Sequence, residues 1–261
     1  MTANRAIDSV HGFKVRANRL LFILAAFAVS WPPQTVLAAS IALDIGHTLK
    51  NPGAISARGV AEFEYNRQLA REVAETLRSA GHWTLLIGDD GLAEDLGSRA
   101  PRAKGMDLFI SIHHDSVQAR YLSAWEHEGE QRLYADDRFS GFSLFVSNLN
   151  PHTAASLKCA SAIGAELRKS GFQPSRYHAD PVLGENRPFA DEANGVHYFD
   201  NLAVLKTAGI PALLFEAGVI VNRDEELKMR DPAVRRAIAG SITAGVKNCL
   251  KGSAAAPRKD K

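Results

Sequence analysis

The stretch that decides the fold is Asp107–Ser116, DLFISIHHDS. Its first half is an apolar run rich in β-branched and aromatic residues, which is typical of a strand buried on both faces in an α/β sheet. Ligands of open α/β sheets bind beyond the carboxyl ends of the strands, so His113, His114 and Asp115 are expected at a site. The alternative is that these polar residues only begin a solvated loop.

Two further apolar stretches lead to polar side chains in the same way. Ile41–Ile45 runs into a loop that contains His47, and Pro211–Phe215 is followed directly by Glu216. Three strand ends that offer metal ligands or acid/base groups favour a functional edge of the sheet over a coincidence.

A helix is predicted from about residue 61 to residue 80, with Gly81 as its stop. Glu62 lies on the same inward face as Leu69, seven residues later, and Asn66 shares that face. Glu64 belongs to a face that is expected to be solvated. If one acid of this helix points into a site, it is therefore Glu62.

Together these residues predict a zinc site. A catalytic zinc takes three protein ligands of the nitrogen or oxygen type, and His47, Glu62 and His113 supply such a set from two strand ends and one helix face. Glu216 is expected to be partly desolvated and to act as the general base, returning its proton to the leaving amine. The alternative for Glu216 is a carboxylate that merely ends a strand.

These residues lie in motifs that resemble those of the zinc-dependent N-acetylmuramoyl-L-alanine amidases, the type 3 peptidoglycan amidases. The motifs occur in the family's order and are IALDIGH at 41–47 with NPGA at 51–54, GVAE at 59–62 with Asn66, DLFISIH at 107–113, and IPALLFEAGVIVN at 210–222. The resemblance implies one α/β domain with a mixed, mostly parallel central sheet flanked by helices on both faces. It also implies one Zn²⁺ held by His47, Glu62 and His113, a catalytic Glu216, and cleavage of the amide between N-acetylmuramic acid and L-alanine.

The N-terminus reads as an export signal. Basic residues precede the apolar run 20–29, and Val36-Leu37-Ala38 offers a cleavage point after Ala38, with Ala39 as the second choice. An uncleaved membrane anchor is the alternative. We expect a signal peptide at 1–38, a catalytic domain at 39–250 and a disordered tail at 251–261, with an exported protein in the periplasm or cell envelope and no stable membrane span after cleavage.

The charge balance argues against nucleic acid as a partner. The chain has 31 basic and 29 acidic residues, and residues 1–38 hold four of the basic and one of the acidic ones, which leaves 27 against 28 and a formal charge of −1. A nucleic-acid binder needs a basic face on its folded domain. The expected partners are peptidoglycan and, if the enzyme requires one, an activator protein.

Several features stay open at the level of sequence. Residues 117–200 contain a strand and a helix but are otherwise expected to be an irregular insert that shapes access to the site. Cys159 and Cys249 either form one bridge or stay as two buried thiols. His114, His178 and His197 either contact the substrate or are ordinary loop residues, and the second alternative is favoured because loop histidines without a partner are common.

Two other functions compete with the amidase. A zinc carboxypeptidase or endopeptidase acting on stem peptides would share the metal ligands. A non-catalytic peptidoglycan-binding regulator could keep the fold, although such a module has no need of a general base at Glu216.

Overall fold

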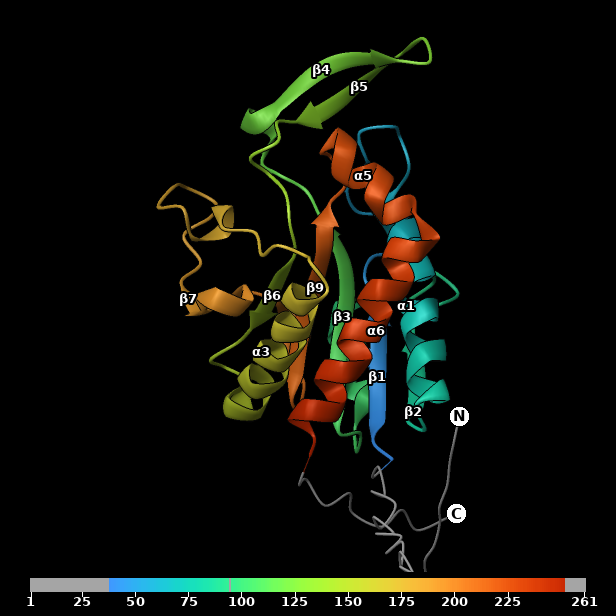
Figure 1. Cartoon of the computed structure of the whole chain (residues 1–261), viewed down its shortest axis with the longest axis vertical. Helices are drawn as coiled ribbons and strands as arrows, with labels where there is room; N and C mark the ends of the chain where they lie inside the picture. The colour runs from blue at the N-terminus through green and yellow to red at the C-terminus, as the bar shows by residue number, and fades with distance from the viewer. Residues whose placement is uncertain (1–37, 94, 252–261) are drawn as a thin grey trace, which may run out of the picture. The chain divides into compact units, whose positions relative to one another are not determined.

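Three parallel strands with apolar side chains on both faces form the centre of the sheet (Figure 1). The computed structural model describes residues 38–93 and 95–251, and these belong to one compact unit. The central strands are β1 (Ser40–Ile45), β3 (Leu108–Asp115) and β9 (Ala212–Val219), and nearly all of their residues are buried. The buried strand expected within Asp107–Ser116 is therefore present.

Four shorter strands complete a seven-stranded sheet in the order β2-β1-β3-β9-β6-β8-β7. They are β2 (Trp83–Ile87), β6 (Ser143–Val146), β7 (Phe189–Asp191) and β8 (Val196–Tyr198). The pairs β6·β9 and β7·β8 are antiparallel and the other four are parallel. The prediction of a mixed, mostly parallel α/β sheet in a single domain is confirmed.

Helices cover both faces of this sheet. Figure 1 shows the three long helices on one face, where they bury the larger core cluster. These are α1 (Glu62–Ser79), α3 (Thr153–Lys169) and α6 (Pro232–Cys249). The other face carries a smaller cluster under α4 (Ala203–Lys206) and the turn η1 (Ala100–Ala103), which continues α2 (Leu96–Arg99).

A disulfide between Cys159 and Cys249 ties α3 to α6. Both residues are 2% exposed and lie in the larger core cluster. The structure thus selects the bridged alternative for the two cysteines.

The region 117–200 is more regular than expected. It contains the antiparallel hairpin of β4 (Leu122–His127) and β5 (Glu130–Ala135), as well as β7, β8 and the turns η2 (Ala119–Tyr121), η3 (Tyr177–Ala179) and η4 (Glu192–Asn194). The prediction of an irregular stretch was wrong for the hairpin because exposed residues lie on both of its faces, so its sequence shows no alternation.

One helix was also missed in the sequence analysis, α5 (Arg223–Arg230), which lies between β9 and α6. Its start is marked by Asn222, whose side chain accepts hydrogen bonds from the amides of Asp224 and Glu225. An Asn cap followed by an acidic first turn is a sequence signal for a helix start, so this helix could have been predicted.

The predicted signal peptide, apart from Ala38, and the tail beyond Lys251 lie outside the described residues. Within 38–93 and 95–251, no helix has both the length and the apolar character that crossing a bilayer requires.

The disulfide should contribute strongly to stability. Its partners are 90 residues apart, and the loop-entropy model gives at most about 4–5 kcal/mol for closing a loop of that length. Replacing Cys159 and Cys249 together by serine should lower the free energy of unfolding in urea by up to this amount. Reduced wild-type protein should show the same loss, and two reactive thiols in the unfolded, unreduced protein would contradict the bridge.

Candidate active site

Three side chains from different elements meet at the carboxyl end of the central strands. His47 lies in the loop after β1, Glu62 in the first turn of α1 and His113 near the end of β3. Glu62 Oε2 is 2.9 Å from His47 Nε2, and Glu62 Oε1 is 3.0 Å from His113 Nδ1. The potential ligand atoms all lie within 4.8 Å of one another, so the three residues form a group that could hold a metal ion.

The Glu62 carboxylate is held by the backbone and by Asn66. Glu62 Oε2 accepts from the amide of Ala54 at 3.1 Å, and Oε1 accepts from Asn66 Nδ2 at 3.1 Å. Burial alone would raise the pKa of Glu62, but the hydrogen bonds and charges of His113 and His47 lower it well below its usual range. Its place at the helix N-terminus also favours the ionised form.

His114 supports this arrangement from the core. It is 2% exposed, and its Nδ1 lies 2.8 Å from Asn66 Oδ1. Burial lowers the pKa of His114 to about 3, so the ring is neutral. The expectation of a loop residue was wrong for His114: it is a buried residue of β3 that fixes the amide partner of Glu62.

Two glycines allow the ligands to approach the backbone closely. A Cβ on Gly46 would lie 2.3 Å from the His113 ring, and one on Gly53 would lie 2.4 Å from Glu62 Oε2. Gly53 also has a φ of +79°, a conformation that glycine adopts without steric cost. The loop around His47 is therefore shaped by the space that the two other side chains need.

A buried arginine sets the path of this loop. Arg99 is 1% exposed and pairs with Asp44 Oδ1 at 2.7 Å. Its guanidinium also donates to the carbonyl oxygens of Ile45 and His47, at 2.6 Å each. His47 itself has a φ of +70°, which is uncommon for a non-glycine residue and needs such support.

Glu216 lies beside His113 on the neighbouring strand. It was expected just past a strand, but β9 continues to Val219, and Glu216 is paired in register with His113. The strand continues because its later residues still pair with the end of β3, across an irregularity next to the site. Strand neighbours in register project to the same face, so this pairing brings Glu216 to the group of potential ligands.

The Glu216 carboxyl is in an unusual environment. Its Oε2 is buried and has no hydrogen-bond partner among the described residues. Burial, together with the charges of Asp115 and Glu62, raises the pKa of Glu216 well above its ordinary value. A carboxyl with a raised pKa is suited to accept and return a proton near neutral pH.

One cavity of about 400 Å³ is lined by the three potential ligands and by Glu216. Its far wall consists of residues from the segment 178–187 and of Asp115. The predicted site residues His47, Glu62, His113 and Glu216 are thus brought together at one place in the fold.

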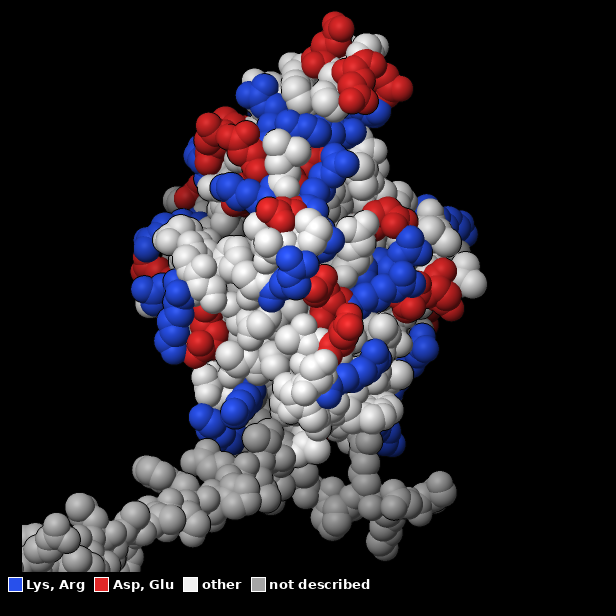
Figure 2. Space-filling view, turned by 45° about the vertical axis from the view of Figure 1, so that its right-hand side comes forward, with Lys and Arg blue, Asp and Glu red and all other residues white. Residues whose placement is uncertain are grey.

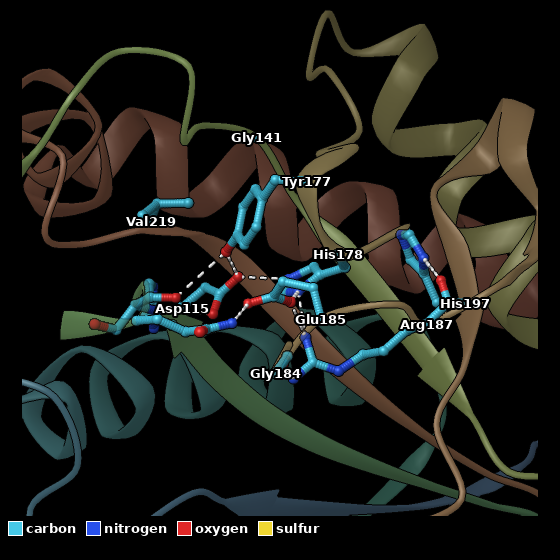
Figure 3. A network of polar contacts seen from close by, with 12 residues as sticks. Asp115, Gly141, Tyr177, His178, Gly184, Glu185, Arg187, His197 and Val219 are labelled. Carbon is cyan, nitrogen blue, oxygen red and sulfur yellow. Dashed lines mark hydrogen bonds and ion pairs between the residues drawn. The ribbon is translucent and has the colours of Figure 1, made fainter. Parts of the chain in front are cut away.

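The far wall is a network of charged and polar side chains (Figure 3). Asp115 was expected at a site, whereas the sequence did not indicate its partners Tyr177, Glu185 and Arg187. His178 is 3% exposed and lies between Asp115 Oδ2, at 2.7 Å, and Glu185 Oε2, at 2.9 Å. Burial alone would lower the pKa of His178, but Asp115 and Glu185 outweigh it and raise the pKa. Tyr177 also donates to Asp115, and Arg187 Nη1 lies 2.5 Å from Glu185 Oε2.

His197 borders this cluster at the backbone of Arg187 (Figure 3), and its ring centroid lies 5.7 Å from that of His178. It is fully buried in β8, its Nδ1 lies 3.1 Å from the Arg187 carbonyl oxygen, and burial lowers its pKa to about 4. His178 and His197 were both expected in loops, and both are buried. No local pattern distinguishes them, because their partners lie in other segments.

Comparison with known proteins identifies relatives over most of the chain. A model of the N-acetylmuramoyl-L-alanine amidase family matches residues 41–248. The amidase AmiC of Neisseria meningitidis serogroup B is 26% identical over 230 residues, which is 82% of this chain and 53% of that protein. The chain spans about half the length of three curated relatives that it matches.

Two solved structures share the fold. The amidase Ami1 of Mycobacterium smegmatis has a TM-score of 0.64 at 20% identity and covers 83% of this chain and 98% of its own. The CwlD amidase of Clostridioides difficile, solved in complex with the GerS lipoprotein, has a TM-score of 0.58 at 19% identity, covering 82% of this chain and 98% of its own.

Replacing Arg99 should disturb both stability and the site. Arg99→Met leaves Asp44 buried without its partner, which typically costs about 3–5 kcal/mol of unfolding free energy, and it also frees the His47 carbonyl. As a control, Arg71→Met removes an ion pair with Asp89 whose side chains are 54% and 38% exposed, which should cost about 1 kcal/mol or less. Urea unfolding gives both values, and equal losses would contradict the structural role of Arg99.

Proposed function

The chain belongs to the N-acetylmuramoyl-L-alanine amidase family, and on this basis we propose that it hydrolyses the amide bond between N-acetylmuramic acid and L-alanine in peptidoglycan. The observation that carries the proposal is the meeting of His47, Glu62, His113 and Glu216 in one cavity. Such a combination of a potential metal group with a partly desolvated acid suits hydrolysis of an unactivated amide.

We propose that His47, Glu62 and His113 hold one Zn²⁺. Two imidazole nitrogens and a carboxylate oxygen are the donor set that catalytic zinc takes, and their mutual distances allow one ion to reach all three. When bound, zinc supplies a Lewis acid for the substrate carbonyl and lowers the pKa of water. The hydrogen bonds from Asn66 and Ala54 to Glu62 would keep the ligands oriented.

In this proposal Glu216 moves the proton. It accepts a proton from the attacking water and returns it to the peptide nitrogen as the carbon–nitrogen bond breaks. The second proton of the water also passes to the released amine, which leaves a lactyl carboxylate on the sugar and an ammonium group on L-alanine. Its unpartnered Oε2 and its raised pKa support this role. Asp115 contributes through its charge, which favours the protonated form of Glu216.

We further propose that the protein is exported by residues 1–38 and acts in the periplasm or cell envelope, in cell-wall remodelling. Peptidoglycan would be its substrate. A partner protein that activates it is a further proposal, supported by the solved complex of the CwlD amidase with a lipoprotein.

Digestion of purified peptidoglycan tests the reaction. The purified protein with added zinc should release intact stem peptides, and EDTA should stop the release because the metal group is emptied. Mass spectrometry of the products identifies the bond that is cut. Shortened stem peptides would indicate a carboxypeptidase or endopeptidase instead, and zinc binding without any product would indicate a non-catalytic module.

Single replacements should separate metal binding from proton transfer. His113→Ala should lose both bound zinc and activity, whereas Glu216→Gln should keep about one zinc per chain and lose activity by about 10²–10⁴-fold, the usual contribution of a general acid/base. Metal analysis and digestion rates on the same preparations provide the comparison. A His113→Ala protein with full zinc content would refute the ligand assignment.

A further inference from the structure

A second hollow of about 400 Å³ lies next to the cavity of the site. Ala54 and Ser116 line both of them. A molecule bound at His47, Glu62 and His113 can therefore extend into the second hollow without leaving the surface of the protein.

The walls of this second hollow are mainly apolar. On one side Leu122 and Leu133 belong to the β4–β5 hairpin, and on the other side Ile55 belongs to the loop before α1. Leu133 and Ile55 are 52% and 48% exposed, although large aliphatic side chains are usually covered. Exposed apolar side chains on two walls of one hollow are typical of a surface that a ligand covers.

The hairpin is anchored, so the hollow exists before a ligand binds. Trp125 Nε1 donates to the carbonyl oxygen of Ala57 at 3.1 Å, and the amide of Ala135 donates to the carbonyl oxygen of Val221 at 2.9 Å. The Arg132 guanidinium of the hairpin also packs closely against Gly59. A Cβ added to Gly59 would lie 2.6 Å from Arg132 Cζ. Preformed walls reduce the entropy lost on binding.

The two ends of the combined cavity differ in charge. The far wall of the first cavity contains Asp115 and Glu185 together with Arg187, which pairs with Glu185, whereas Arg132 is the one charged residue among those that line the second hollow. Arg132 also pairs with Glu130, whose side chain is 64% exposed. Figure 2 shows Lys and Arg side chains gathered below an acidic tip at this end of the molecule. The second hollow therefore favours a ligand that is partly apolar and carries negative charge.

The proposed substrate has two halves, and only one of them fits this description. The sugar half presents hydroxyl and acetamido groups, which proteins recognise through hydrogen-bonding side chains and aromatic rings. The stem peptide presents alkyl side chains and free carboxylates. We propose that the hollow between the hairpin and the loop at Ile55 binds the stem peptide of the substrate, an inference that rests on the proposed amidase function.

Leu133→Asp tests this assignment, because it replaces an apolar contact by a charge that repels the peptide. The measured quantity is the preference, as a ratio of kcat/KM values, for N-acetylmuramoyl-tetrapeptide over N-acetylmuramoyl-L-alanine. We expect the preference to fall by about tenfold, the effect of losing part of the apolar contact between one leucine side chain and the ligand that covers it. Ile55→Gln, on the opposite wall, should lower it in the same direction.

Leu149→Asp is the matched control, since Leu149 is 61% exposed and lines neither hollow. It should leave the preference unchanged. The assignment is overturned if Leu133→Asp and Ile55→Gln show the same wild-type preference as the control. It is also overturned if the preference depends on glycan length instead.

A binding measurement separates this inference from the amidase proposal. Isolated stem tetrapeptide and a peptide-free muramyl disaccharide are titrated separately into the wild-type protein and into Leu133→Asp. We expect the replacement to weaken binding of the peptide alone. If the protein cleaves no muropeptide but still binds the peptide in a Leu133-dependent way, the proposed reaction fails and the peptide site stands. If cleavage occurs but peptide binding does not depend on Leu133, the peptide site fails.

Discussion

The site depends on the ion pair and the hydrogen bonds that the buried guanidinium of Arg99 makes. The guanidinium is neutralised by Asp44 and bound to the carbonyl oxygens of Ile45 and His47, so one side chain connects the end of β1 to the loop that follows. A charge in this position would cost several kcal/mol without its partner. The loop is consequently held in one conformation, including the left-handed backbone of His47. Stability and the geometry of the site are therefore properties of the same contacts.

The sheet places the remaining groups. Because β3 and β9 are parallel neighbours in register, His113 and Glu216 lie side by side at one edge, and α1 brings its first turn to the same edge. The carboxyl groups of Glu62 and Glu216 lie at this same edge, and their burial strengthens the interactions of their charges. This explains why Glu62 and Glu216 have pKa values shifted in opposite directions: Glu62 has two imidazole partners, whereas Glu216 has none.

The segments outside the central sheet provide the walls of the site. The network around His178 lines the cavity of the site, and the β4–β5 hairpin lines the neighbouring hollow. Apart from Asp115 of β3, both come from residues 117–200. The central strands can thus keep the metal group and the acid fixed while the walls differ in charge and apolar character.

The sequence alone determined the core of this protein and the residues of its candidate site. The apolar strands, the inward face of α1 and the polar residues at the strand ends are local patterns, so they predict the α/β sheet and bring His47, Glu62, His113 and Glu216 into one hypothesis. Only the tertiary structure decided what depends on contacts between distant segments. The Cys159–Cys249 bond, the burial of His178 and the path of the His47 loop under Arg99 each join residues more than 50 positions apart. The hairpin was missed for a different reason: residues exposed on both of its faces produce no alternation that a sequence could reveal.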